Sequence, residues 1–174
     1  MSPTLSGNVF LLVEWTEEPD YQLGDLILFP SEPTDLLVVH RVCGLKTTES
    51  GGQILQIADR LLIGDKMGGG WLPIEVILGR IVSIRWGEPG TKATNIESRL
   101  HCFVGKLIAV LSARQWEYVK HLSKRRIGSI SPLFGWKTLD RLTFSALHRL
   151  VCYGYSIFLR VTAIALQENN VEEL

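Results

Sequence analysis

A buried strand is predicted for Leu36-Leu37-Val38-Val39-His40-Arg41-Val42-Cys43-Gly44-Leu45. The run is rich in β-branched valine, and it is bounded by the turn-forming Pro33-Thr34-Asp35 before it and by Gly44 near its end, which is typical of strands. His40 and Arg41 are the polar residues at its centre. Because a lone histidine in such a run is more often a core or edge residue than a functional group, a role for His40 needs support from the rest of the chain.

Short strands are predicted on both sides of this stretch. Apolar, β-forming runs occupy residues 8–15, 26–29, 53–58 and 75–86. Gly24-Asp25 predicts a tight turn, Lys46 to Gly52 a hairpin loop, and Gly64 to Gly70 a glycine-rich turn without the spacing of a phosphate-binding loop. Residues 1–90 are therefore expected to fold as a mainly β domain, a meander of short strands.

The pattern changes to helical periodicity after the breaker cluster from Gly87 to Lys92, which is the predicted boundary between two segments. One apolar helical face contains Val104, Leu107, Ile108, Leu111, Val119 and Leu122. A second stripe alternates steps of three and four at Leu139, Leu142, Ala146, Leu150, Tyr153, Ile157 and Val161. Residues 91–174 are therefore expected to form a basic, α-helical extension that packs as a separate layer.

Composition limits the classes of function. The chain has 174 residues, enough for one domain with a hydrophobic core and an appendage. Its net charge is zero, but residues 1–90 carry 6 basic and 12 acidic residues whereas residues 91–174 carry 12 and 6. Such asymmetry indicates two modules that dock by complementary charge, or a basic module that faces an anionic partner. The cysteines have no metal-ligand spacing, so no metal site or other cofactor is expected.

The C-terminal half raises the question of a membrane. The run from Leu150 to Leu166 is apolar, but Arg160 lies within it, and a central arginine costs about 3 kcal/mol on insertion scales. A packed or surface-lying helix is therefore favoured over a span. For the basic cluster from Lys120 to Arg126, a solvated surface is favoured over anionic lipid, and no nucleic-acid partner is expected. Without a visible secretory signal, the predicted location is cytoplasmic or peripheral on a membrane, through the C-terminal helices.

Five short sequence blocks occur in a fixed order. They are Met1-Ser2-Pro3-Thr4-Leu5, Gly24-Asp25-Leu26-Ile27-Leu28-Phe29, Val38-Val39-His40-Arg41-Val42, Ile54-Leu55-Gln56-Ile57-Ala58-Asp59 and Leu78-Gly79-Arg80-Ile81-Val82. Together they resemble the signal peptidase I-like and LexA-like serine peptidases. Bacterial signal peptidases usually carry lysine in the third block, whereas the archaeal and endoplasmic-reticulum type carries histidine. The chain thus resembles the histidine branch. The resemblance covers about the first half of the chain, and it implies a β-rich peptidase fold for residues 1–90.

The resemblance implies a serine endopeptidase that cleaves signal or leader peptides after small residues. His40 would be the general base, because a neutral imidazole can accept the serine proton at neutral pH. An aspartate, either Asp59 or Asp65, would fix the tautomer of the ring and stabilise the imidazolium. Arg41 would point to the opposite face of the strand and make a structural ion pair.

The nucleophile is the departure from the family pattern. In the family the serine immediately precedes the Met of the first block, and that Met is residue 1 here. Three explanations are open, in this order: a start codon assigned downstream of an encoded serine, loss of the nucleophile, or transfer of its role to Ser2. Loss would make the chain a non-catalytic module that binds a peptide or partner. A LexA-like self-cleaving regulator is a further alternative, but it needs a DNA-binding segment, and no helix-turn-helix pattern is evident.

Overall fold

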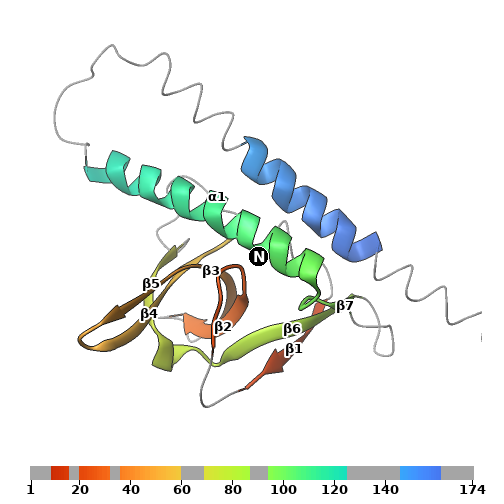
Figure 1. Ribbon diagram of the computed structural model, residues 1–174, viewed down its shortest axis with the longest axis horizontal. Helices are drawn as coiled ribbons and strands as arrows, with labels where there is room; N and C mark the ends of the chain where they lie inside the picture. The colour runs from red at the N-terminus through yellow and green to blue at the C-terminus, as the bar shows by residue number, and fades with distance from the viewer. Residues whose placement is uncertain are drawn as a thin grey trace, which may run out of the picture.

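The structure of the chain, a computed structural model, describes residues 9–15, 20–31, 36–59, 69–86, 94–124 and 146–161. A single antiparallel sheet of seven strands dominates it (Figure 1). The strands are β1 (Val9–Glu14), β2 (Leu26–Ser31), β3 (Leu36–Thr48), β4 (Gly51–Ile57), β5 (Gly69–Pro73), β6 (Gly79–Trp86) and β7 (Thr94–Asn95), and a short 3₁₀ helix, η1 (Ile74–Val76), follows β5. The strand order is β1-β6-β2-β3-β4-β5, with β7 paired to β6.

Two helices form a layer over one face of the sheet, as predicted. They are α1 (Arg99–Lys124) and a second helix at residues 146–161, which lie side by side in Figure 1. Of the helix predicted from Leu139 to Val161, residues 139–145 lie outside the described ranges, as do Arg125 and Arg126 of the basic cluster. Neither α1 nor any other helix in the described ranges combines the length and the apolarity needed to cross a bilayer.

The helices and the sheet share one hydrophobic core. His101, near the start of α1, packs against Phe158, whereas Ser112, farther along α1, contacts His148, so the two helices run antiparallel. The buried residues between the layers come from β2, β6 and both helices, and they are Leu26, Ile81, Ile84, Ile108, Cys152, Tyr155 and Leu159. The change of pattern near residue 90 therefore corresponds to a change of layer within one packed unit. The last strand, β7, lies after this change in the sequence.

β3 carries the stretch from which the fold was predicted, and core residues cover both of its faces. Residues 40–43 are all buried, although successive side chains of a strand point to opposite faces. The face away from the helices packs into a second core made of Tyr21, Ile27, Phe29, Val42 and Ile54. The other face meets the helices, where Cys43 packs near Ala109 of α1. His40 and Arg41 are therefore buried in two different environments.

α1 comes close to the turn before β2 at a pair of glycines, Gly24 and Gly105. Gly24 has a φ of 97°, and a Cβ added to it would lie 2.6 Å from the backbone of Gly105. A Cβ on Gly105 would in turn lie 3.0 Å from the carbonyl oxygen of Gly24 and 3.2 Å from the guanidinium of Arg41. Both positions therefore need glycine, one for its backbone conformation and both for the close contact. This contact places the first half of α1 over Arg41.

The mainly β class with C-terminal helices is confirmed, and most of the predicted strands are present. The runs at 8–15, 26–29, 36–45 and 53–58 correspond to β1, β2, β3 and β4, whereas the run at 75–86 begins in η1 and becomes a strand, β6, only from Gly79. The hairpin between β3 and β4 is tighter than predicted, because pairing continues to Thr48 and Gly51. The predicted turn from Gly64 to Gly70 is wrong at its end, because Gly69 and Gly70 belong to β5 and pair with β4. Without side chains to form a pattern, these two residues gave no strand signal.

Candidate functional site

His40 lies on β3, as predicted, on the face of the sheet away from the helices. Its side chain is buried and packs edge-on against Phe29, with the ring centroids 5.5 Å apart. Nδ1 of His40 forms a hydrogen bond with Oε1 of Gln56 on the neighbouring strand β4. Gln56 is the cross-strand partner of Val42, so its side chain lies diagonally across from His40 on the same face.

The contact with Gln56 favours one tautomer of His40. With Oε1 of the Gln56 amide facing the ring, Nδ1 is the donor of this hydrogen bond, because an amide oxygen only accepts. In the neutral imidazole the lone pair is then on Nε2. A general base takes up a proton through that lone pair while an acceptor holds the other ring nitrogen. The contact between His40 and Gln56 corresponds to the second of these two features, an acceptor on Nδ1.

Arg41 lies on the opposite face of β3 and is paired with Asp59. Its Nε and Nη2 donate to the two carboxylate oxygens of Asp59 at 2.9 and 2.8 Å, and Nη1 donates to the carbonyl of Gly24 at 2.7 Å. The guanidinium also lies 5.8 Å from the centre of the Tyr155 ring. Burial works against the charged guanidinium, but the charge of Asp59 and its hydrogen bonds outweigh this, and the pKa of Arg41 is raised. The structural ion pair predicted for Arg41 is confirmed.

One of the two aspartates expected to orient His40 is engaged on the other face of β3. The Asp59 carboxylate is bound to Arg41 on the helix side of β3, whereas the ring of His40 is hydrogen-bonded to Gln56. Asp65 and Ser2, the other predicted site residues, lie outside the described residues. The sequence held one signal for Gln56, a polar side chain within the otherwise apolar run of β4. Its meaning depends on the pairing register, which the sequence does not reveal.

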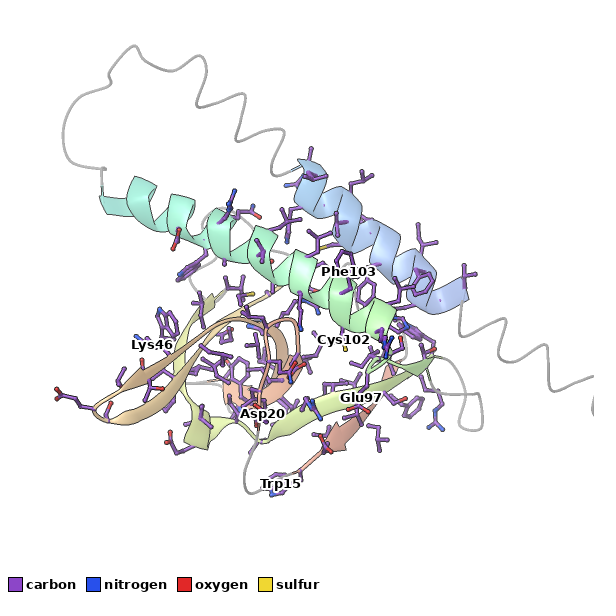
Figure 2. The ribbon with its side chains drawn as sticks, viewed as in Figure 1. Trp15, Asp20, Lys46, Glu97, Cys102 and Phe103 are labelled. Carbon is purple, nitrogen blue, oxygen red and sulfur yellow. The ribbon has the colours of Figure 1, made fainter. Side chains whose placement is uncertain are left out.

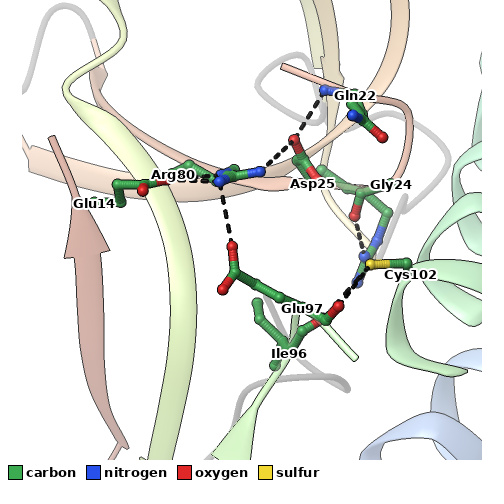
Figure 3. Close-up of polar contacts among 9 residues, drawn as sticks. Glu14, Gln22, Gly24, Asp25, Arg80, Ile96, Glu97 and Cys102 are labelled. Atoms are coloured by element: carbon green, nitrogen blue, oxygen red, sulfur yellow. Dashed lines mark hydrogen bonds and ion pairs between the residues drawn. The ribbon is translucent and has the colours of Figure 1, made fainter. Parts of the chain in front are cut away.

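Arg80 of β6 holds three carboxylates together beside the helical layer (Figure 3). Its Nη2 lies 2.6 Å from Glu14 and 3.2 Å from Glu97, and its Nη1 lies 3.9 Å from Asp25. The hydrogen bond with Glu14 raises the pKa of Arg80. Burial raises the pKa of Asp25, although the backbone N–H of Gln22, which donates to its carboxylate at 2.8 Å, opposes this shift. These contacts tie β1, β2 and β6 to the segment that precedes α1.

A cavity of about 200 Å³ lies between this charged cluster and the helices. Its lining includes Asp25, Arg41, Arg80, His101 and Tyr155. His101 is buried, burial lowers its pKa, and its Nδ1 has no hydrogen-bond partner among the described residues. The arginines and Asp25 are engaged by one another or by other carboxylates, so the charged part of this lining is best explained as a structural clamp.

A second serine and histidine pair joins the two helices. The hydroxyl of Ser112 lies 2.9 Å from Nε2 of His148, and Sγ of Cys152 lies 3.6 Å from the same nitrogen. Burial lowers the pKa of His148 and raises the pKa of Cys152 to about 12. Ser112 is fully buried and His148 is only 3% exposed, so a peptide cannot reach the hydroxyl. The pair is a structural hydrogen bond within the core rather than a catalytic dyad.

Comparison of the chain with protein-family models, with curated proteins and with solved structures gave no match. The case for a function rests on the sequence blocks and on the contact between His40 and Gln56.

Proposed function

We propose that this protein is a serine endopeptidase of the signal peptidase I-like class, with His40 as its general base. The observation that carries the proposal is the hydrogen bond between Nδ1 of His40 and Oε1 of Gln56, because a ring that donates from Nδ1 has its lone pair on Nε2. The order of the sequence blocks supports it, because the second, third and fourth blocks coincide with the successive strands β2, β3 and β4. The β-rich peptidase fold suggested by those blocks is part of the same proposal.

In the proposed reaction, a serine hydroxyl attacks the carbonyl carbon of the scissile peptide bond, and Nε2 of His40 takes up its proton. The imidazolium then gives this proton to the departing amine, which leaves an acyl-enzyme. Water attacks the ester in the same way, again through His40, and releases the carboxylic acid and the serine. Gln56 accepts from Nδ1–H at every stage. As a neutral acceptor it orients the ring, but it stabilises the imidazolium less than a carboxylate would.

The pair of Arg41 and Asp59 supports this base from the other side of β3. Arg41 is adjacent to His40 in the chain, and its three donated hydrogen bonds reach Asp59 and Gly24. These contacts tie β3 to the segment just after β4 and to the turn before β2, which lies under α1. Arg41 is therefore a positioning residue for His40.

The segment before β1 is long enough to bring a hydroxyl to the ring. Val9 pairs with Trp86, at the opposite end of β6 from Arg80, which lies level with Ile27 and His40. The offset along the strands is roughly 20 Å and the offset across three strand spacings roughly 14 Å, a separation of roughly 25 Å. The eight residue steps from Met1 to Val9 span at most about 27 Å when extended. A serine just before Met1 satisfies this limit. Ser2 satisfies it where the curvature of the sheet shortens the separation.

Peptide cleavage by two forms of the protein tests the proposal. One form starts at Met1, and the other is extended upstream through the reading frame to include any encoded serine that precedes Met1. Both are offered fluorogenic peptides with small residues before the scissile bond, the specificity that the resemblance suggests. We expect cleavage by the extended form, and loss of that cleavage in His40→Ala.

Gln56→Leu provides the sharper readout, because it removes the orienting acceptor but leaves the base. We expect its kcat to fall by about 10² or more with little change in KM, since the wrong tautomer becomes available to His40. If the Met1 form cleaves and Ser2→Ala abolishes that cleavage, the nucleophile is Ser2 and the assignment as a serine endopeptidase stands. If neither form cleaves, or if cleavage survives in His40→Ala, the peptidase proposal fails and a non-catalytic interaction module replaces it.

A further inference from the structure

The outer side of the helical layer is unusually apolar. Nine large apolar side chains of the two helices are 40–69% exposed, and they are Leu100, Phe103, Leu107 and Val110 of α1 with Leu147, Leu150, Tyr153, Ile157 and Val161 of the helix at 146–161. We call this set the outer apolar face. Monomeric proteins rarely expose large apolar side chains in such a concentration without a binding role.

The two halves of the outer apolar face point the same way. Each half recurs at steps of three and four residues, which is one face of a helix. The opposite face of each helix is buried, with Ile108 from α1 and Cys152 from the second helix in the shared core. Figure 2 shows Phe103 on the side of α1 away from the sheet. Both apolar stripes therefore lie on the same side of the molecule.

Charge accompanies this apolar surface. The described parts of the two helices, residues 99–124 and 146–161, contain seven lysines and arginines and one acidic residue, Glu117. Arg99, Lys106, Arg114, Arg149 and Arg160 are exposed among the apolar positions or beside them. The described residues of β1 to β6 and their connections hold four basic and six acidic residues. Positive charge is thus concentrated on the layer that also exposes the apolar side chains.

We propose that the outer apolar face binds peripherally to an anionic lipid surface, with the two helices lying parallel to the bilayer. Apolar side chains would enter the boundary between headgroups and acyl chains while the flanking arginines and lysines contact lipid phosphates. A second copy of the chain is disfavoured as the occupant, because two such faces would bring like charges together. The binding does not depend on the peptidase proposal.

The geometry also sets an orientation. His40 lies on the face of the sheet away from the helices, so lipid binding through the helical layer leaves that side of the sheet turned away from the bilayer. A bound molecule would therefore hold the core around His40 on the side away from the lipid.

Co-flotation of the full chain with vesicles tests the proposal. Vesicles of phosphatidylcholine alone are compared with vesicles that contain about one third phosphatidylglycerol. We expect binding to the anionic vesicles that is at least about ten-fold stronger than to the neutral ones and that weakens as salt is raised. Arg99→Glu combined with Arg149→Glu should abolish this preference.

A matched pair of double variants separates the outer apolar face from other exposed apolar residues. Phe103→Ser with Leu150→Ser changes residues that are 66% and 69% exposed, and Leu12→Ser with Leu36→Ser changes residues of the sheet that are 62% and 66% exposed. We expect vesicle binding by Phe103→Ser with Leu150→Ser to fall about ten-fold or more. Binding by Leu12→Ser with Leu36→Ser should stay within about two-fold of the parent chain. Circular dichroism should show that both pairs keep the parent fold.

Three results would overturn the lipid proposal. They are equal binding to neutral and anionic vesicles, equal loss in the two double variants, and failure of the parent chain to bind any vesicle. Sedimentation equilibrium tests the main alternative, in which a second copy of the chain binds the outer apolar face. If the parent chain is a dimer and the double variant Phe103→Ser with Leu150→Ser is a monomer, the outer apolar face binds a second copy of the chain instead.

Discussion

Removing Arg41 should destabilise the protein more than removing any exposed charge. Arg41→Met keeps a long apolar stem but deletes the guanidinium, whose side chain is 2% exposed. The change breaks the two hydrogen bonds to Asp59 and the one to the carbonyl of Gly24. Since the Asp59 side chain is fully buried, its carboxylate loses its cation without gaining access to water.

The size of the effect follows from that burial. Removing one partner of a buried ion pair costs about 3–5 kcal/mol, because the other charge stays buried without compensation. With a urea dependence of about 2 kcal/mol per molar, the unfolding midpoint should fall by about 2 M. The Tm should fall by roughly 10 °C for a chain of this length. Arg41→Lys should fall between the parent and Arg41→Met, because an ammonium cannot make the bidentate contact.

Urea unfolding followed by tryptophan fluorescence and far-ultraviolet circular dichroism measures the change. Arg41→Met with Asp59→Leu is the critical control, because it removes both charges and should recover most of the lost stability. Arg80→Met, which removes a partly exposed arginine, should cost about 1 kcal/mol or less. A loss below about 1 kcal/mol in Arg41→Met, or a double variant no more stable than the single one, would refute the assigned role of the pair.

Three further outcomes are expected. Gly24→Ala should cost about 2 kcal/mol or more in urea unfolding, because its φ of 97° disfavours a side chain and a Cβ would lie 2.6 Å from the backbone of Gly105. Ser112→Ala should cost about 1–3 kcal/mol by removing the hydroxyl partner of His148, whereas the exposed Ser50→Ala should be nearly neutral. Stability should decline as pH falls below the ordinary histidine pKa of 6.5. Burial lowers the folded-state pKa of His148, so the unfolded chain takes up a proton at a higher pH than the folded chain does. The decline should end at the folded-state pKa, and it should be smaller in His148→Gln.

Much of the sheet could be predicted because its strands carry local signals. β3 contains a run of valines between turn residues, and β-branched side chains favour a pleated, buried strand. The alternation of faces along a strand also predicted that Arg41 would point away from His40 into an ion pair, as found. β5 could not be predicted, since Gly69 and Gly70 have no side chains to form a pattern.

The contact of Gln56 with His40 could not be predicted, because it depends on register. The pairing of β3 with β4 shifts between Val42 and Gly44, which leaves Cys43 as an extra residue and sets Gln56 opposite Val42. Without that bulge, a different residue of β4 would lie diagonal to the ring. The apolar outer face of the helices was equally hidden, because a periodic stripe does not reveal which of its members remain exposed after packing.

The tautomer of His40 tests the central claim most directly, because a base for a serine hydroxyl needs its lone pair on Nε2. NMR of the chain with isotope-labelled histidine, at mildly alkaline pH, distinguishes the protonated nitrogen of each neutral ring. We expect the proton of His40 on Nδ1, and we expect Gln56→Leu to shift the ring toward the other tautomer. A proton on Nε2 in the parent chain, or a tautomer that is unchanged in Gln56→Leu, would contradict the claim that Gln56 prepares His40 as a general base.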